Sequence, residues 1–305
     1  MIAFSTAMEN IKIRAALALF ITMLFWGTAA VFMRTMALAL SSENSLAIRY
    51  VILSAINVGL LLAFGTWRIE RADWARFAVA GLAGMAGYNW FVNAGFALVP
   101  AGIGTIVTMV EPLMIAVLPF MLVGEQLSRH ILLGAALACV GAIVLFWRDL
   151  TEAAPESVSA LGVGYLLLCC LAWAIYTIVT KPLLAKYDSF TVTAVTMLIA
   201  APVLIGAATE PLSALFLSLD ARQWGELFYL VIPNGLLGTL LWNYGTKQLS
   251  GASAGVFLYL IPIIAVAAGA LILGETVTVL IVCGGILMIA GVAFAQFGPA
   301  LLARR

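Results

Sequence analysis

Charged residues are scarce in this chain of 305 residues: Asp, Glu, Lys and Arg make up 10% of it, and hydrophobic residues make up 64%. A soluble domain holds about 25% charged and about 45–50% apolar residues. A water-soluble fold of this size would therefore lack the polar groups needed to cover its surface. The same hydrophobicity excludes a disordered chain. The composition predicts a polytopic membrane protein.

Side chains and motifs that bind nucleic acid, metals or phosphate are also few. The formal net charge is +1, which excludes the basic surface that binds nucleic acid. A single histidine, His130, and four cysteines in apolar runs, Cys139, Cys169, Cys170 and Cys283, give no metal-ligand or disulfide spacing. No phosphate-binding Gly-x-x-x-x-Gly-Lys-Ser/Thr loop is present. We therefore expect no cofactor, no metal, no nucleic-acid partner and no enzymatic activity.

Runs without charged residues predict the membrane spans, because a helix needs about 20 apolar residues to cross the hydrocarbon core. The run 77–124 is interrupted only by Glu111 and is too long for one helix, so we divide it at the turn-forming segment 99–102. With these two helices the total is ten, an all-α integral membrane fold. The other spans are 15–33, 50–67, 131–147, 157–180, 189–209, 227–246, 248–274 and 276–303.

The distribution of Lys and Arg predicts the orientation in the membrane. Eleven of these residues lie on the side that holds both termini, and four lie on the other side, Arg49 among them. Cytoplasmic loops carry the excess of Lys and Arg. Both termini are therefore expected in the cytoplasm of a bacterial cell, with the chain embedded in the inner membrane.

The second half of the chain repeats the first at an offset of 150 residues. Glu111-Pro112 corresponds to Ile261-Pro262, and Asn93 corresponds to Asn243. Near the start the offset is 147, so that Trp26 corresponds to Trp173. We expect a first five-helix repeat over 1–150 and a second over 151–305. Because five is odd, the second repeat enters the membrane from the opposite face, and inverted repeats are typical of secondary transporters.

The repeated motif resembles a known family. It consists of Pro112, Gly124-Glu125, Gly134 and Gly141, which recur as Pro262, Gly274-Glu275, Gly284 and Gly291. This pattern resembles the EamA repeat of the drug/metabolite transporter superfamily over essentially the whole chain. The resemblance implies ten helices and export of amino acids or other metabolites across the bacterial inner membrane. Within the superfamily, the chain is most similar to the YddG-type exporters of aromatic and other bulky neutral amino acids.

The candidate pathway residues are polar or aromatic side chains inside predicted spans. Glu111 is the one ionisable residue deep in a span, where a carboxylate costs about 2.5–3.5 kcal/mol on insertion scales. It either contacts a substrate ammonium or a proton, or it is a protonated acid that bonds to a neighbouring helix. Aromatic and amide groups would form a chamber around the substrate, the alternative being ordinary helix packing. The predicted substrate-pathway residues are Trp26, Tyr88, Trp90, Asn93, Glu111, Trp173, Tyr176, Trp242, Asn243 and Tyr259.

Two further pairs of equivalent residues have expected roles. Pro112 and Pro262 lie at matched mid-helix positions, where proline removes a backbone donor and acts as a hinge or a static kink. Glu125 and Glu275 lie at helix ends, where they accept hydrogen bonds from exposed backbone donors. For both glutamates we expect a structural role.

The sequence thus predicts an exporter of small amphipathic metabolites, most of all aromatic and other bulky neutral amino acids, by alternating access. Its expected partners are a small-molecule substrate and the lipid bilayer, and a monomer is the expected state. A drug-type multispecific efflux carrier, a lipid flippase and a non-transporting membrane scaffold are the alternatives.

Overall fold

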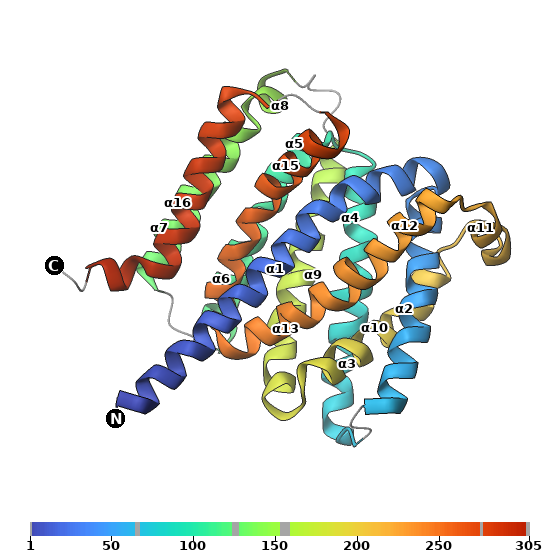
Figure 1. Cartoon of the computed structure of the whole chain (residues 1–305), viewed down its shortest axis with the longest axis horizontal. Helices are drawn as coiled ribbons and strands as arrows, with labels where there is room; N and C mark the ends of the chain where they lie inside the picture. Colours follow the sequence, from blue (N-terminus) through green and yellow to red (C-terminus); the bar gives the residue numbers. More distant parts are fainter. Residues whose placement is uncertain (1, 65–67, 124–127, 153–158, 275–276, 303–305) are drawn as a thin grey trace. The chain divides into compact units, whose positions relative to one another are not determined.

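The computed structural model describes residues 2–64, 68–123, 128–152, 159–274 and 277–302 (Figure 1). Within these ranges every regular element is helical and no strand occurs. The first half contains α1 (Ile2–Leu40), α2 (Ser42–Phe64), η1 (Arg71–Asp73), α3 (Trp74–Val79), η2 (Ala80–Gly87), α4 (Tyr88–Phe96), α5 (Ala101–Thr108), α6 (Glu111–Val123), α7 (Arg129–Leu145) and α8 (Trp147–Glu152). The second half contains α9 (Ala160–Lys186), α10 (Ser189–Ile205), α11 (Leu212–Ser218), α12 (Ala221–Tyr229), η4 (Leu230–Leu237), α13 (Gly238–Gln248), α14 (Gly251–Gly255), η5 (Val256–Leu260), α15 (Ile261–Leu273) and α16 (Val279–Leu302).

The element boundaries repeat with the offset that the sequence predicts. The segments η2 and η4 are both π-helices of 8 residues, and they begin at Ala80 and Leu230, 150 positions apart. The helices α6 and α15 likewise begin at Glu111 and Ile261. Because π-helical turns are rare, their presence at equivalent positions is independent support for the internal repeat.

In the part of the chain that the structure describes, seven helical stretches are long and apolar enough to cross a membrane. They are Asn10–Leu40, Ser42–Ala63, Ile103–Met121, Ala160–Lys186, Ala221–Gln248, Gly251–Ile272 and Val279–Gln296. The apolar helices Arg129–Leu145 and Ser189–Ile205 are shorter. Length and hydropathy therefore identify a multi-pass membrane protein, but they give seven spans where the sequence predicts ten.

Large apolar side chains on the protein surface fit the same conclusion. Leu217 and Leu271 are each 87% exposed, and Val279 is 78% exposed. Large exposed apolar patches are rare on soluble proteins. Leu271 and Val279 belong to candidate spans, so a bilayer would place these two side chains against lipid tails.

The chain divides into two compact units. Unit 1 consists of Met1–Gly87 and Ile175–Leu249, and unit 2 consists of Tyr88–Ala174 and Ser250–Arg305. Each unit takes residues from both halves of the sequence. The units are defined by which residues pack together, whereas the repeats are defined by sequence similarity between the two halves. The repeat boundaries at 1–150 and 151–305 therefore stay a prediction.

In unit 1, α1 packs along α13 and α2, and α10 packs against α2, η2 and α13. Small residues permit close approach of these elements: a Cβ atom at Gly84 of η2 would lie 2.6 Å from the Cβ atom of Tyr176. The aromatic ring of Tyr176 is therefore held against the π-helical backbone.

In unit 2, α7 and α16 form a close helix pair and lie side by side in Figure 1. A Cβ atom at Gly134 would lie 2.5 Å from the carbonyl oxygen of Gly291, and one at Gly141 would lie 2.7 Å from the carbonyl oxygen of Gly284. As α7 advances from 134 to 141, the contacts on α16 move back from 291 to 284. The two helices are therefore antiparallel, although the repeat makes them equivalent.

The second helix begins earlier than the sequence predicts. We expected a span over 50–67 and placed Arg49 in a loop, but α2 begins at Ser42 and Arg49 lies inside the candidate span Ser42–Ala63. Its side chain is buried, with 8% exposed. The predicted start was wrong because a span was defined as a run without charged residues. The buried guanidinium of Arg49 lies inside the real span and ends such a run too early.

Asp73 joins two elements at one end of unit 1. Its side chain is 1% exposed and accepts hydrogen bonds from Lys186 Nζ, Tyr187 Oη and Arg76, each at 2.9 Å. The bond from Lys186 is the largest effect on the pKa of Asp73; together with the bonds from Tyr187 and Arg76 it holds that pKa below its usual value, against the opposing effect of burial. The carboxylate thus ties η1 to the last turn of α9.

Candidate substrate pathway

The predicted pathway residues divide between the two units. Unit 1 contains Trp26, Tyr176, Trp242 and Asn243. Unit 2 contains Tyr88, Trp90, Asn93, Glu111, Trp173 and Tyr259. Each unit therefore has its own group of polar and aromatic side chains, which we describe separately.

In unit 1, Trp26 of α1 lies against the junction of η4 and α13. Its indole Nε1 donates to the carbonyl oxygen of Asn234 at 3.1 Å. Gly238 leaves room for the indole, because a Cβ atom there would lie 2.5 Å from Nε1. The rings of Trp26 and Trp242 are 5.6 Å apart, and Trp242 is fully buried. Helix packing thus places two tryptophans side by side within one unit.

A polar network lies in the same unit. The amide Nδ2 of Asn243 donates to the Thr193 hydroxyl and to the Tyr176 hydroxyl, both at 2.8 Å. Tyr176, Thr193 and Asn243 are all fully buried. Three helices, α9, α10 and α13, supply these groups, so the network fixes polar atoms in an otherwise apolar core.

In unit 2, Tyr88 and Trp173 form an aromatic pair with ring centroids 5.2 Å apart. Glu111, the first residue of α6, is buried with 8% exposed and interacts electrostatically with Tyr88. No ion pair of the described residues includes Glu111. Unit 2 therefore combines an aromatic surface with a buried carboxylate that no described cation neutralises.

Two cysteines complete the surroundings of Glu111. A carboxylate oxygen of Glu111 and the sulfur atoms of Cys169 and Cys170 lie within 4.8 Å of one another. These donors are of the kinds that bind zinc, but a structural zinc site has four ligands, and this cluster has three. Both cysteines lie in apolar runs of the sequence, and both are fully buried. Their proximity to Glu111 had no signal in the sequence, since 58 positions separate Cys169 from Glu111.

The remaining aromatic and amide candidates in unit 2 have different surroundings. Tyr259 is fully buried, and its hydroxyl donates to the Met109 carbonyl oxygen at 3.2 Å, which favours a role in packing. Trp90 of α4 is 47% exposed, and Asn93 of the same helix is half-buried.

The two hinge candidates lie at helix starts. Pro112 is the second residue of α6 and Pro262 is the second residue of α15. Within the candidate spans Ile103–Met121 and Gly251–Ile272 the two prolines lie near the middle, as the sequence predicts, and each stands where a new α-helical segment of its span begins. Proline fits the first turn of a helix, where its missing N–H would have no partner. The hinge role stays a prediction, and Glu125 and Glu275 lie outside the described residues.

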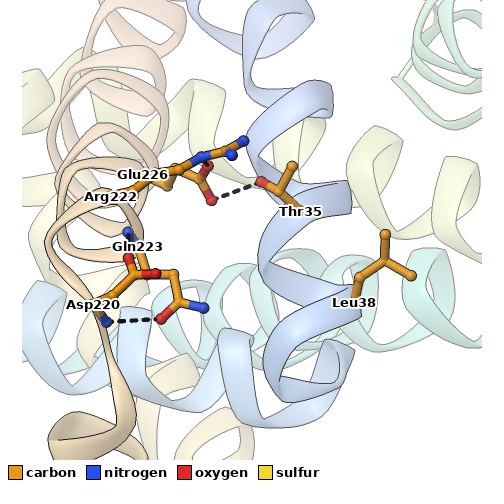
Figure 2. Close-up of a pocket in the computed structure, with 6 residues that line it drawn as sticks. All are labelled: Thr35, Leu38, Asp220, Arg222, Gln223 and Glu226. Carbon is orange, nitrogen blue, oxygen red and sulfur yellow. Dashed lines mark hydrogen bonds and ion pairs between the residues drawn. The ribbon is translucent and has the colours of Figure 1, made fainter. Parts of the chain in front are cut away.

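A pocket of about 230 Å³ lies elsewhere in unit 1, between the last turns of α1 and the start of α12 (Figure 2). It is lined by Thr35, Leu38, Asp220, Arg222, Gln223 and Glu226. Glu226 is buried, accepts from Thr35 at 2.7 Å and pairs with Arg222 at 2.9 Å. The pocket contains none of the predicted pathway residues. Glu226 is thus a second buried glutamate besides Glu111, near the start of the candidate span Ala221–Gln248.

Family comparison agrees with this geometry. The family described as the EamA-like transporter family matches residues 13–147 and 160–296. The chain belongs to this family, and it is therefore a membrane transporter and not an enzyme, as the sequence predicts.

Relatives with named functions are exporters. The chain is 28% identical to a probable terminal-alkyne amino-acid exporter of Streptantibioticus cattleyicolor, with 92% of each chain covered. It is 27% identical to a probable amino-acid metabolite efflux pump of Escherichia coli, over 83% of this chain and 81% of the relative. It is 26% identical to the aromatic amino acid exporter YddG of Ancylobacter novellus, over 78% of this chain and 83% of the relative.

A solved crystal structure of another protein has the same fold. The match has a TM-score of 0.77 at 24% identity and covers 95% of this chain and 98% of the other. At this identity the likeness supports the fold alone.

Proposed function

We propose that the protein exports amino acids with large apolar side chains across the bacterial inner membrane by alternating access. The observation that carries the proposal is the pairing of buried aromatic rings with buried polar groups inside spans of a transporter-family chain. An aromatic surface favours an apolar side chain, and a buried carboxylate favours an ammonium group. Three relatives named as exporters or efflux pumps of amino acids or their metabolites support the same substrate class.

The proposed topology has ten helices in two inverted five-helix repeats, with both termini in the cytoplasm. The seven spans and the two shorter apolar helices account for nine of them, and the continuous helical stretch 74–96 is the tenth. The antiparallel contact of the equivalent helices α7 and α16 supports the inversion. In such transporters the two repeats rearrange around a site near the midplane.

Within unit 2 we assign Glu111 to the polar head of the substrate and the Tyr88–Trp173 pair to its side chain. A carboxylate without a described ion-pair partner is available to an ammonium group or to a proton. The pH dependence of flux distinguishes facilitated transport from transport coupled to protons.

Uptake by proteoliposomes tests the proposal. Purified protein should carry radiolabelled phenylalanine, tryptophan and leucine faster than glycine or glutamate, and cationic dyes should not compete. Faster flux of dyes than of any amino acid would instead identify a multispecific drug carrier, and no flux of any solute would identify a scaffold.

Glu111→Gln should lower phenylalanine flux about tenfold or alter its pH dependence, which corresponds to about 1.4 kcal/mol of interaction. Glu152→Gln is the matched control, because Glu152 is an exposed acid of the same unit that pairs with Arg148. Glu111 has no part in the pathway if its variant matches the wild type at every pH.

A further inference from the structure

Arg49 is a buried cation for which the described residues supply no counter-charge. Its side chain is 8% exposed, and its Nε atom is buried without a hydrogen-bond partner. None of the ion pairs among the described residues includes it. A guanidinium stays charged in proteins. Such a group in a membrane span is costly and marks a functional site unless an anion neutralises it.

The depth of Arg49 excludes the usual explanation for an arginine in a membrane helix. Seven residues separate it from the start of α2 at Ser42, which is about 10 Å along a helix at 1.5 Å per residue. Arginines near helix ends extend their heads to the membrane surface. Arg49 is instead buried among the helices of its own unit, since α2 packs against α1, α10 and η4.

The described group that interacts electrostatically with Arg49 is the hydroxyl group of a tyrosine. Tyr50 interacts electrostatically with both Arg49 and Tyr176. Tyr176 in turn lies in the hydrogen-bonded network with Asn243 and Thr193. Hydroxyl and amide groups can orient an anion, but they do not neutralise a guanidinium.

The described carboxylates of unit 1 that are buried have other partners. Asp73 accepts from Lys186 and Arg76, and Glu226 accepts from Arg222 and Thr35. Neither is therefore available to Arg49. No described buried carboxylate of unit 1 is left for Arg49, so an anion from outside the chain would supply the missing charge.

We infer that Arg49 binds the α-carboxylate of the transported amino acid. A guanidinium matches a carboxylate through two parallel N–H···O bonds, which are short and strong when both groups are charged. This inference rests on the proposed function and narrows it to substrates with a free carboxylate. It depends on unit 1 alone.

Paired substrates test the inference in proteoliposomes. Phenylalanine and phenethylamine share the aromatic ring and the ammonium group, and phenethylamine lacks the carboxylate. Arg49→Met should lower phenylalanine flux about 10- to 100-fold, the value of hydrogen bonds to a charged group, and leave any phenethylamine flux unchanged. Arg49→Lys keeps the charge but loses the planar fork, so it should retain an intermediate flux. Equal losses for both substrates, or an unchanged preference for phenylalanine, would overturn the inference.

A binding measurement separates this inference from the proposed function. The carboxylate 3-phenylpropionate should raise the melting temperature of the detergent-solubilised wild type, and phenethylamine at the same concentration should do so less. The shift by 3-phenylpropionate should disappear in Arg49→Met and persist in Arg34→Met, which removes an exposed arginine of α1 in the same unit. A shift of equal size in Arg49→Met rejects the site even if amino acids are transported. A shift in melting temperature that depends on Arg49 supports the site even if no amino acid is transported.

Discussion

The tryptophans at equivalent positions of the two halves meet different partners. Trp26 lies against Gly238 in unit 1, and Trp173 lies against Tyr88 in unit 2. The offsets of 147 and 150 residues make the two contacts equivalent. In unit 1 the absent side chain at Gly238 lets the indole reach the carbonyl oxygen of Asn234, whereas in unit 2 a second aromatic ring fills that place.

The two units differ in their buried charge as well. Unit 1 contains Arg49, for which no ion pair is described, besides Asp73 and Glu226, which are paired, and unit 2 contains Glu111 beside two thiols. The two halves therefore share their helix boundaries and their close glycine contacts, but they differ in the charged and polar side chains that they bury.

The largest expected effect concerns what the two halves share, the glycine contacts of α7 and α16. Gly134→Ala places a Cβ atom 2.5 Å from a backbone oxygen, and the equivalent Gly284→Ala places one 2.5 Å from the backbone nitrogen of Leu145. Each variant should lower the free energy of unfolding by about 1–3 kcal/mol through overpacking. Thermal unfolding in detergent measures the effect.

The control for this prediction is Gly164→Ala in α9 of the same unit, where nothing lies within 4 Å of the added atom. It should be neutral or slightly stabilising, because alanine favours helix more than glycine does. Melting temperatures that are the same for Gly134→Ala and Gly164→Ala would contradict the close contact.

A smaller effect is expected where the two halves differ. Trp26→Ala removes the ring beside Trp242, and Trp173→Ala removes the ring beside Tyr88. Each should lower the ratio of phenylalanine to leucine flux about 2- to 10-fold, the range that aromatic pairs contribute. Trp147→Ala, which removes a 49% exposed ring from α8, serves as control. Wild-type selectivity in both variants would remove the basis for an aromatic substrate site.

The smallest effect concerns Asp73 at the end of unit 1. Its pKa is lower in the folded protein than in the unfolded chain, so the ionised carboxylate stabilises the fold at every pH above its unfolded value. This stabilisation is lost as the pH falls below about 4 and through the folded pKa. Asp73→Asn should therefore melt below the wild type at pH 7, and the difference should shrink under acid conditions.

Asp149→Asn, at an exposed position of α8, is the matched variant for Asp73. It should follow the wild type across the same pH series. A melting difference between wild type and Asp73→Asn that stays constant down to pH 3 would show that the hydrogen bonds to Lys186 and Tyr187 do not depend on the charge.

Sequence reasoning predicted the helical membrane class, the family and the repeat because each depends on composition or spacing. It also placed Glu111 in the core correctly, since a lone acid in a long apolar run has few other positions. It missed the burial of Arg49 because charge was used to define where spans end. It could not bring Cys169 and Cys170 to Glu111, because tertiary contacts between distant helices leave no local pattern.

The crossing of α7 and α16 has a consequence for ancestry. Gly134 contacts Gly291, and Gly141 contacts Gly284. Exchanging each glycine for its equivalent in the other half turns one of these contacts into the other, as in a self-complementary dimer. A polypeptide half this long could make the same crossing only with a sister molecule inserted upside down in the bilayer. Joining the two copies in a single gene removes the need for one sequence to adopt both orientations, and it frees each copy to acquire its own buried charge.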